Sequence, residues 1–361
     1  MSAVLGWLLA SALLLTACGG GAGAEDKSAG ESGGAGGLSS VTLAVGDTGW
    51  ARHRAVLELA GLDDTPYTVK WSVFQGGDLQ LQAMRAGALD VAQSSEIPPV
   101  FAAADGKANF KVVAVQKGNT LLQEVVAPKG SAVTTIGQLK GKKVGYVKNT
   151  TAQYFLYELL KRAGLRWSDI TAVPLLPDAG IAALSGGSVD ALASYGNAII
   201  TAHTQGATTI GSGADILSGN FNWEASDRTL ADPAARAATA DLLARIDRAW
   251  AYLRDGHQRE YAKVFAAHTH QPVRLALSQF EDGERQRPTR IETTGEAALA
   301  SGQRVADAFH QLGALPARLD VGTFWSDALD ADLTRALGSS GASAPSSAPA
   351  ATAPATETPT S

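Results

Sequence analysis

The sequence contains almost no cysteine: its 361 residues include one, Cys18, which lies in an apolar N-terminal segment. An internal disulfide, a cysteine-based zinc site and an iron–sulfur centre are therefore excluded, and so is thiol chemistry in the rest of the chain. Basic residues are in the minority. The 30 Lys and Arg against 35 Asp and Glu give a net charge of −5, which argues against a protein that binds the phosphate backbone of nucleic acids.

The apolar N-terminal stretch, residues 4–15, is too short to cross a bilayer as a helix but has the length of a signal-peptide core. It leads into residues 15–18 (LTAC), which resemble the bacterial lipobox, in which the cysteine is diacylated and becomes the new N-terminus. No Lys or Arg precedes the apolar run, which departs from the signal-peptide pattern. We expect a signal peptide over 1–18 with Cys18 as the lipidated N-terminus; the alternative is a buried core segment.

Low-complexity segments flank the expected folded body. Residues 19–40 consist mainly of Gly, Ala and Ser with a few charges, a composition typical of a flexible tether. Residues 338–361 are Ser, Ala, Pro and Thr with one charge, so they have too little apolar surface to offset the entropy of ordering. We expect the tail to be disordered and the fold to occupy 41–337.

Strand-like and helix-like segments alternate in the first half of the body, and the pattern repeats about a hundred residues further on. Residues 84–92 (MRAGALDVA) are echoed by 184–192 (LSGGSVDAL), and 45–48 (VGDT) by 147–150 (VKNT). The matched pairs include Gly87 with Gly187, Asp90 with Asp190, and Ser94 with Ser194. The alternation and the echo predict two similar α/β lobes with mainly parallel sheets.

From Pro233 onward the apolar residues recur at helical spacing, as in the stripe from Leu242 to Leu253. These helices are expected to pack on the first lobe, so the chain would cross twice between lobes and form a hinge with a cleft. The predicted boundaries are 41–127 plus 221–337 for lobe one and 128–220 for lobe two. Ligands of open α/β sheets bind at the carboxyl ends of strands, which would face this cleft.

Several motifs resemble a known family. They are residues 89–101 (LDVAQSSEIPPVF), 126–131 (VAPKGS), 136–145 (IGQLKGKKVG), 303–309 (QRVADAF), 319–321 (LDV) and 324–325 (FW). The chain resembles the ABC-transporter solute-binding lipoproteins of the aliphatic sulfonate, taurine and nitrate class, which have a type II periplasmic-binding fold. The resemblance covers about residues 41–325. Relatives often carry Trp-Asp-Pro-Tyr after the lobe-two strand, where this chain has 194–198 (SYGNA).

The resemblance implies a monomeric receptor without a cofactor that delivers its solute to a membrane permease. It would be lipid-anchored in the cell envelope, on the outer face of the cytoplasmic membrane. The expected ligands are sulfonates or taurine-like solutes, and the alternatives are nitrate, aromatic acids and thiamine or riboflavin precursors. Sulfinate desulfinases and thiamine-pyrimidine synthases also resemble these proteins, but they depend on cysteine. Because Cys18 is the only cysteine, a non-enzymatic role is expected.

Candidate ligand-binding residues follow predicted strands or begin predicted helices. They are Thr48, Gly49, Trp50, Gln75, Ser94, Ser95, Glu96, Gln116, Asn149, Thr150, Thr151, Tyr195, Asn197 and Asn222. The helix after Thr150 would present free backbone N–H groups to an anion, although ordinary N-capping is the alternative. Trp50 would cover part of the solute or belong to the core. Glu96 suits an anion site only if it pairs with a cation or with an amine of the solute. We expect Ser95 and Thr150 on opposite walls of one cleft.

Other patterns carry less weight. His268-Thr269-His270 has no carboxylate at ligand spacing, so solvated histidines at a helix end are expected instead of a metal site. The glycines at 186–187 and 211–213 lack the Lys-Ser/Thr of a phosphate-binding loop. The basic residues Arg285, Arg287 and Arg290 favour a solvated face, with a docking or anion-attracting rim as the alternative.

Overall fold

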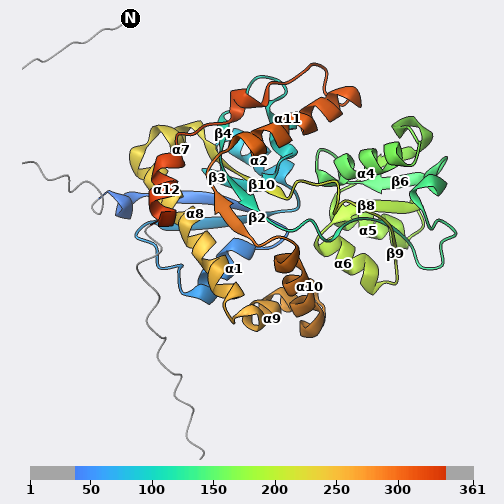
Figure 1. Ribbon diagram of the computed structural model, residues 1–361, viewed down its shortest axis with the longest axis horizontal. Helices are drawn as coiled ribbons and strands as arrows, with labels where there is room; N and C mark the ends of the chain where they lie inside the picture. Colours follow the sequence, from blue (N-terminus) through green and yellow to red (C-terminus); the bar gives the residue numbers. More distant parts are fainter. Residues whose placement is uncertain (1–36, 339–361) are drawn as a thin grey trace, which may run out of the picture. The chain divides into compact units, whose positions relative to one another are not determined.

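The chain folds into two β-sheets, each with helices packed against it (Figure 1). The computed structural model describes residues 37–338, which lie within one structural unit. The first sheet contains β1 (Thr42–Thr48), β2 (Thr68–Phe74), β3 (Val91–Ser95), β4 (Phe110–Lys117), β10 (Asn220–Ser226) and β11 (Arg290–Glu292). Its order is β11-β4-β10-β3-β1-β2. The second sheet contains β5 (Gln123–Ala127), β6 (Lys143–Tyr146), β7 (Thr171–Pro174), β8 (Ala191–Tyr195) and β9 (Thr208–Ser212), in the order β7-β6-β8-β5-β9. These sheets are the centres of lobe one and lobe two. The prediction of mainly parallel sheets is wrong, because five of the nine strand pairings within residues 37–338 are antiparallel.

The predicted lobe boundary after residue 127 is corrected by the strand pairing. β5 is antiparallel to β8 and β9, so residues 123–127 belong to the sheet of lobe two. The chain therefore crosses between lobes at 118–122 and again at 213–219. The two crossings are joined by the Gly118 N–H, which donates to the Gly219 carbonyl at 3.0 Å, and by Thr120 Oγ1, which donates to the Ala214 carbonyl at 2.8 Å. This pair of linked crossings forms the hinge region.

The internal echo corresponds to a repeated structural unit. In lobe one, Asp90 Oδ2 accepts a 2.8 Å hydrogen bond from the Ala44 N–H of β1. In lobe two, Asp190 Oδ2 accepts the same bond, also 2.8 Å, from the Lys143 N–H of β6. Each carboxylate thus ties the start of one parallel strand to the start of its neighbour. The pairing makes Ala44 equivalent to Lys143, so the proposed match of 45–48 with 147–150 is displaced by three residues.

Helices cover the faces of the lobe-one sheet. They are α1 (Arg52–Ala60), α2 (Gly77–Arg85), α3 (Pro98–Ala103), α7 (Asp227–Ala231), α8 (Pro233–Arg254), α9 (Gln258–Thr269), α10 (Val273–Gln286), α11 (Glu296–Gln311) and α12 (Asp330–Gly338). As expected for Asp-Pro at a helix start, Asp232 caps α8 by accepting from the Ala234 N–H at 2.9 Å. The prediction that the C-terminal helices pack on lobe one is confirmed, since α8 contacts α1, β1 and β11.

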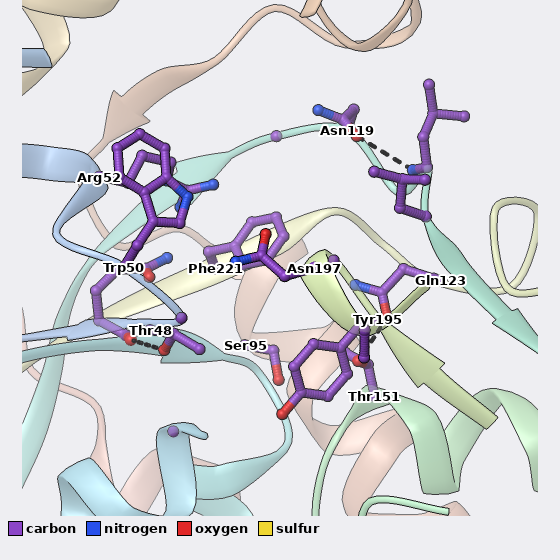
Figure 2. A pocket seen from close by; sticks show the side chains of 18 of the residues that line it. Thr48, Trp50, Arg52, Ser95, Asn119, Gln123, Thr151, Tyr195, Asn197 and Phe221 are labelled. Carbon is purple, nitrogen blue, oxygen red and sulfur yellow. Dashed lines mark hydrogen bonds between the residues drawn. The ribbon is translucent and has the colours of Figure 1, made fainter. Parts of the chain in front are cut away.

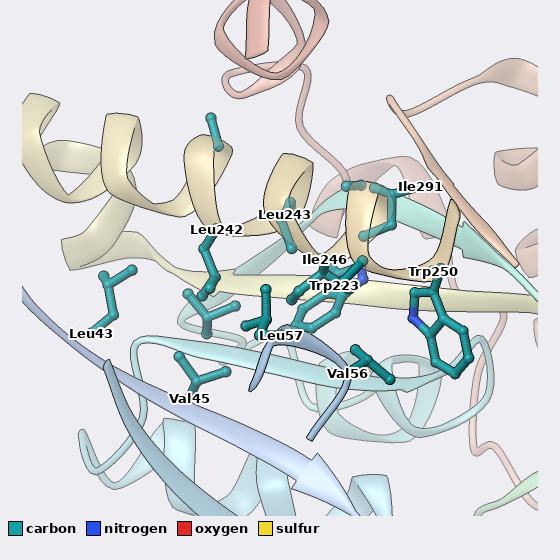
Figure 3. Close-up of a cluster of buried hydrophobic side chains, with 14 of the residues drawn as sticks. Leu43, Val45, Val56, Leu57, Trp223, Leu242, Leu243, Ile246, Trp250 and Ile291 are labelled. Atoms are coloured by element: carbon teal, nitrogen blue, oxygen red, sulfur yellow. The ribbon is translucent and has the colours of Figure 1, made fainter. Parts of the chain in front are cut away.

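The main core of lobe one lies between α8 and the sheet (Figure 3). Leu242, Leu243 and Ile246 of α8 are completely buried and belong to the same cluster as Leu43 of β1 and Trp223 of β10. Burial of each such aliphatic side chain contributes about 1.5–3 kcal/mol. The apolar stripe predicted from helical spacing therefore faces the sheet and fixes the position of α8.

Lobe two is smaller and repeats the same layering. Its helices are α4 (Thr151–Arg162), α5 (Pro177–Ser185) and α6 (Asn197–Thr204). Phe155 and Leu156 of α4 pack with Val144 of β6 in its core. Short 3-10 turns complete the described chain: η1 (Leu38–Ser40), η2 (Ile136–Leu139), η3 (Trp167–Asp169) and η4 (Val321–Phe324). Among residues 37–338, no helix combines the length and apolar character that spanning a membrane requires.

Candidate functional site

A cavity of about 470 Å³ opens where strand ends and helix starts of both lobes meet. Figure 2 shows Thr48, Trp50 and Arg52 on one side of it, and Gln123, Thr151 and Tyr195 on the other. Its volume lies within the roughly 300–1,000 Å³ typical of small-molecule sites. The wall includes residues from the turn after β1, the end of β3 and the starts of α4 and α6, together with side chains from α8, α9 and α10. This is the location that the strand-end rule predicts for a ligand.

Most of the residues predicted from the sequence lie on this wall: Thr48, Gly49, Trp50, Gln75, Ser94, Ser95, Gln116, Thr150, Thr151, Tyr195 and Asn197. Three others lie elsewhere. Asn222 is 2% exposed within β10, between β3 and β4. Asn149 has a φ of 59° and its N–H donates to Gln153 Oε1, so it shapes the turn before α4. Glu96 faces the hinge.

Glu96 is buried beside the second crossing. Its carboxylate accepts from Ser218 Oγ at 2.6 Å and from Asn220 Nδ2 at 3.4 Å. Burial raises the pKa of Glu96, and the hydrogen bonds from Ser218, Ser301 and Asn220 partly oppose that rise. Since this carboxyl group is turned away from the cavity, it does not repel an anion bound there by direct contact. Its geometry instead suits a role in holding the hinge.

The lobe-two side of the cavity begins at the N-terminus of α4. Thr150 Oγ1 donates to the Val147 carbonyl at 2.8 Å and accepts from the Ala152 N–H at 3.2 Å, so its hydroxyl acts as the N-cap. Thr151 Oγ1 donates to Gln123 Oε1 at 2.7 Å. Both hydroxyl protons are therefore used within the protein. An anion on this side would meet mainly backbone N–H groups at the helix start.

The lobe-one side carries two serines at the end of β3. Ser94 Oγ donates to Glu224 Oε1 at 2.6 Å, in the interior of the sheet. Complete burial raises the pKa of Glu224 well above its ordinary value, although the bond from Ser94 opposes the rise. Ser95 Oγ only accepts a long contact, 3.5 Å, from the Ile97 N–H. The hydroxyl group of Ser95 is therefore less engaged than that of Ser94. Ser95 of lobe one and Thr150 of lobe two both line this cavity.

Arg52, which was not predicted as a site residue, is the only Lys, Arg or His side chain on the wall among residues 37–338. It is half-buried at the first position of α1, directly after the Thr48–Trp50 turn. Its Nε atom is buried without a hydrogen-bond partner in the described part of the chain. Its Cζ atom lies 5.7 Å from the centre of the Trp250 ring, a distance at which a cation is attracted by the aromatic face.

Acidic side chains on the wall are occupied by other partners. Glu124 Oε2 lies 2.9 Å from His203 Nε2 and also accepts from Thr209 Oγ1. Glu284 accepts from Arg254, from the Thr289 N–H and from Thr289 Oγ1. Asp282 pairs with Arg285 at 2.6 Å, and Asp178 accepts from Gln75 Nε2 at 2.9 Å. None of these acids is ion-paired with Arg52, whose positive charge also acts on the buried Asp47 carboxylate and helps to lower its pKa.

A buried hydrogen-bonded group supports the Arg52 turn. Asp47 is completely buried at the end of β1, and its carboxylate accepts from the Thr48 and His53 N–H groups, each at 2.8 Å. His53 Nδ1 lies 3.0 Å from Asp47 Oδ2, and His53 Nε2 lies 3.2 Å from Oε1 of the wall residue Gln116. Burial alone would raise the pKa of Asp47, yet His53 and Arg52 hold it below its ordinary value. This group fixes the start of α1 and the amide of Gln116.

The two lobes touch across the mouth of the cavity. Gln75, which follows β2, donates through Nε2 to Asp178 of α5. The Gln75 carbonyl also accepts from Tyr195 Oη, at 3.3 Å, from the end of β8. Burial raises the pKa of Tyr195, and the nearby Asp78 raises it further, so the hydroxyl stays a donor at neutral pH. Gln75 therefore links lobe one to two separate elements of lobe two.

Other sequence patterns have structural explanations. His268 is exposed near the end of α9 and stacks on Trp50, with ring centres 4.6 Å apart. In residues 37–338 no group of three or more His, Cys, Asp or Glu side chains is placed to hold a metal ion. Arg287 is not simply solvated, because it donates to the Ser218 carbonyl at the hinge. Cys18, the tether from 19 to 36 and the tail from 339 lie outside the described residues.

Comparison with known proteins supports the resemblance seen in the sequence. Residues 72–212 match the NMT1/THI5 like family. A protein of Escherichia coli (strain K12) with the provisional name aliphatic sulfonates-binding protein is 27% identical over 253 residues, which cover 70% of this chain and 77% of that protein. A protein of the same name from Bacillus subtilis (strain 168) is 31% identical over 123 residues, 34% of this chain and 37% of that protein. The resemblance to sulfonate-binding proteins is confirmed.

Solved structures share the fold. The alkanesulfonate-binding protein SsuA from Xanthomonas axonopodis pv. citri, bound to MOPS, aligns with a TM-score of 0.71 and 24% identity over 79% of this chain and 98% of that one. The periplasmic aliphatic sulphonate binding protein SsuA from Escherichia coli aligns with a TM-score of 0.68 and 24% identity, over 79% of this chain and 92% of that one. The desulfurization enzyme DSZB aligns with a TM-score of 0.59 and 15% identity, over 83% of this chain and 99% of that one. The predicted two-lobed periplasmic-binding fold is therefore confirmed.

Proposed function

We propose that this protein is the solute-binding component of an ABC importer. It captures a small organic anion of the sulfonate or taurine-like class between its lobes and delivers it to a membrane permease. The proposed chain of events is binding in the open cleft, closure about the hinge at 118–122 and 213–219, and release to the permease. The protein would act as a monomer without a cofactor, anchored in the cell envelope through Cys18.

The observation that carries the proposal is Arg52 on the cavity wall. Its guanidinium group has a buried Nε without a partner, while the wall acids have partners of their own. Backbone N–H groups at the start of α4 lie on the opposite lobe. A bound sulfonate would satisfy donors from both lobes at once, and its negative charge would therefore favour the closed form over the open one. The similarity to proteins named for sulfonate binding supports the same ligand class.

An enzymatic role has less support. DSZB shows that the fold also serves a desulfurization enzyme. Residues 37–338, however, contain no cysteine, so the described cavity wall has no thiol nucleophile. The described cavity wall includes no histidine, and the nearby His53 lies against Asp47 and Gln116, so the wall does not hold a Ser-His-Asp arrangement either. Binding without chemical conversion is the function that fits these side chains.

Titration calorimetry of the full chain tests the proposed function. We expect ethanesulfonate or a larger sulfonate to bind with one site per chain, and nitrate, benzoate and thiamine precursors to bind more weakly. A sulfonate at a hundred times its Kd should also stabilise the native state by about 2.7 kcal/mol, which raises the melting temperature. Tight binding of a thiamine precursor alone, or no binding of any sulfonate, would contradict the assigned ligand class.

Lipidation of Cys18 is a separate part of the proposal. We expect Cys18→Ser to abolish lipid attachment, because only a cysteine thiol forms the thioether to diacylglycerol. In a bacterial host the variant should leave the membrane fraction or accumulate as unprocessed precursor, as fractionation and intact-mass measurement would show. Ser39→Ala, in the predicted tether, is the matched control and should stay with the membrane. Normal processing and membrane retention of Cys18→Ser would rule out the anchor.

A further inference from the structure

One end of the cavity is walled by aromatic side chains. Trp50 follows β1, Trp250 belongs to α8, Tyr261 and Phe265 to α9, and Phe280 to α10. The rings form a continuous cluster: Trp50 stacks on Phe265 with centres 6.0 Å apart, Trp250 lies 5.6 Å from Tyr261, and Tyr261 lies 4.9 Å from Phe280. We call these five residues the aromatic wall. Their separations are those of interacting aromatic pairs.

Arg52 lies at the edge of the aromatic wall. Its guanidinium carbon is 5.7 Å from the centre of the Trp250 ring, and Figure 2 shows it next to Trp50. Trp250 Nε1 is also buried without a hydrogen-bond partner in the described chain. A positive charge thus borders an apolar, ring-lined surface. A ligand that carries both an anionic group and an aromatic ring matches this end of the cavity.

We propose that the solute is an aryl sulfonate, with the sulfonate group at Arg52 and the ring against the aromatic wall. The inference rests on the proposed function and specifies the class of sulfonate. An alkyl chain would gain only the burial of apolar surface there. A ring gains the same burial and adds edge-to-face or offset contacts with Trp50 and Phe265, which aromatic pairs make beyond their buried area.

The wall residues differ in how safely they can be changed. Trp50, Trp250, Tyr261 and Phe280 are at most 8% exposed and belong to the core of lobe one, so truncating them risks unfolding. Phe265 is half-buried and packs at the margin of that core. It is therefore the position at which the ring can be removed with the smallest effect on the fold.

The experiment compares two sulfonates with the same number of carbon atoms by titration calorimetry on the full chain: benzenesulfonate and cyclohexanesulfonate. We expect the parent to prefer the aryl compound by about tenfold. Phe265→Leu should reduce that preference by about two- to tenfold, the range expected for loss of one aromatic contact. Phe265→Tyr keeps the ring and should keep the preference. Phe101→Leu is the matched control, since Phe101 is half-buried in lobe one and packs on Phe309, away from the cavity wall.

The outcomes separate this inference from the proposed function. Equal affinity of the parent for both sulfonates, or an unchanged preference in a folded Phe265→Leu, would overturn the aryl assignment and leave sulfonate binding intact. A preference for cyclohexanesulfonate would do the same. Failure of both compounds, together with ethanesulfonate, would instead contradict the proposed function. The parent measurement needs no variant, so the inference can be tested even if Phe265→Leu does not fold.

Discussion

Replacement of Arg52 by glutamine should weaken sulfonate binding by about 30-fold or more. Losing one member of a buried, hydrogen-bonded charge pair costs about 2–5 kcal/mol in an interface, because the partner charge is left without compensation. Arg52 is the only cation on the described cavity wall, so no neighbouring side chain can take over its role. Arg52→Lys keeps the charge but loses the planar donor arrangement, so its affinity for the sulfonate should lie between those of the parent and Arg52→Gln. Titration calorimetry with ethanesulfonate measures the series.

Arg54 provides a control for this prediction on the same helix. It is two residues further along α1, its side chain is 59% exposed, and it pairs with Glu58 at the surface. Arg54→Gln removes the same formal charge from the lobe without touching the cavity wall, and it should change affinity by less than about twofold, since exposed pairs contribute little. Equal loss in both variants would mean that the general charge of lobe one matters more than contact with Arg52. Parent-like binding by Arg52→Gln would move the anion site elsewhere.

The two-lobed fold could be predicted because local patterns and tertiary structure agree over most of the chain. The apolar stripe predicted from Leu242 to Leu253 belongs to α8 and faces the sheet of lobe one. The position of β5 could not be predicted in this way. Its residues Val125, Val126 and Ala127 are buried like those of any central strand, and such a run does not indicate which sheet it joins. Only the pairing with β8 and β9 assigns it to lobe two.

The displaced echo has a similar cause. Four letters at 45–48 resemble four at 147–150, but the carboxylate bonds of Asp90 and Asp190 set the equivalence three residues away. A short sequence match reflects the residue types that a turn favours. The equivalence of two strands depends instead on which backbone N–H groups donate to which acceptors. The longer match around Gly87 and Gly187 holds, and both glycines adopt positive φ, 78° and 70°, where other residues are strained.

The candidate site was predictable where it depends on strand ends and not where it depends on helix packing. Thr48, Ser95 and Thr151 follow from the rule that loops at the carboxyl ends of strands face the ligand. Apart from Trp50, which was a candidate, the aromatic wall comes from α8, α9 and α10, whose rings at helical spacing predict only core. Arg52 had a local signal, because a basic residue lies two positions after the predicted Thr48–Trp50 turn. The sequence alone did not reveal that this side chain lines the cavity.

Substitution of Asp47 by alanine should destabilise the protein by about 3–5 kcal/mol at neutral pH, the cost of breaking a buried charged contact on one side. The Thr48 and His53 N–H groups would lose their acceptor, and His53 would lose its partner at 3.0 Å while still buried. Because the folded-state pKa of Asp47 is lowered, its contribution is fully present above the ordinary value near 3.9 and is lost as the pH falls through the lowered folded value. Urea unfolding of parent and variant from pH 3 to pH 7 measures this difference in the free energy of unfolding.

Glu58→Ala, which removes an exposed pair on the same helix, should cost less than about 1 kcal/mol at every pH. A small cost for Asp47→Ala at pH 7, or a difference from the parent that does not shrink in acid, would show that the Asp47–His53 contact does not hold the start of α1.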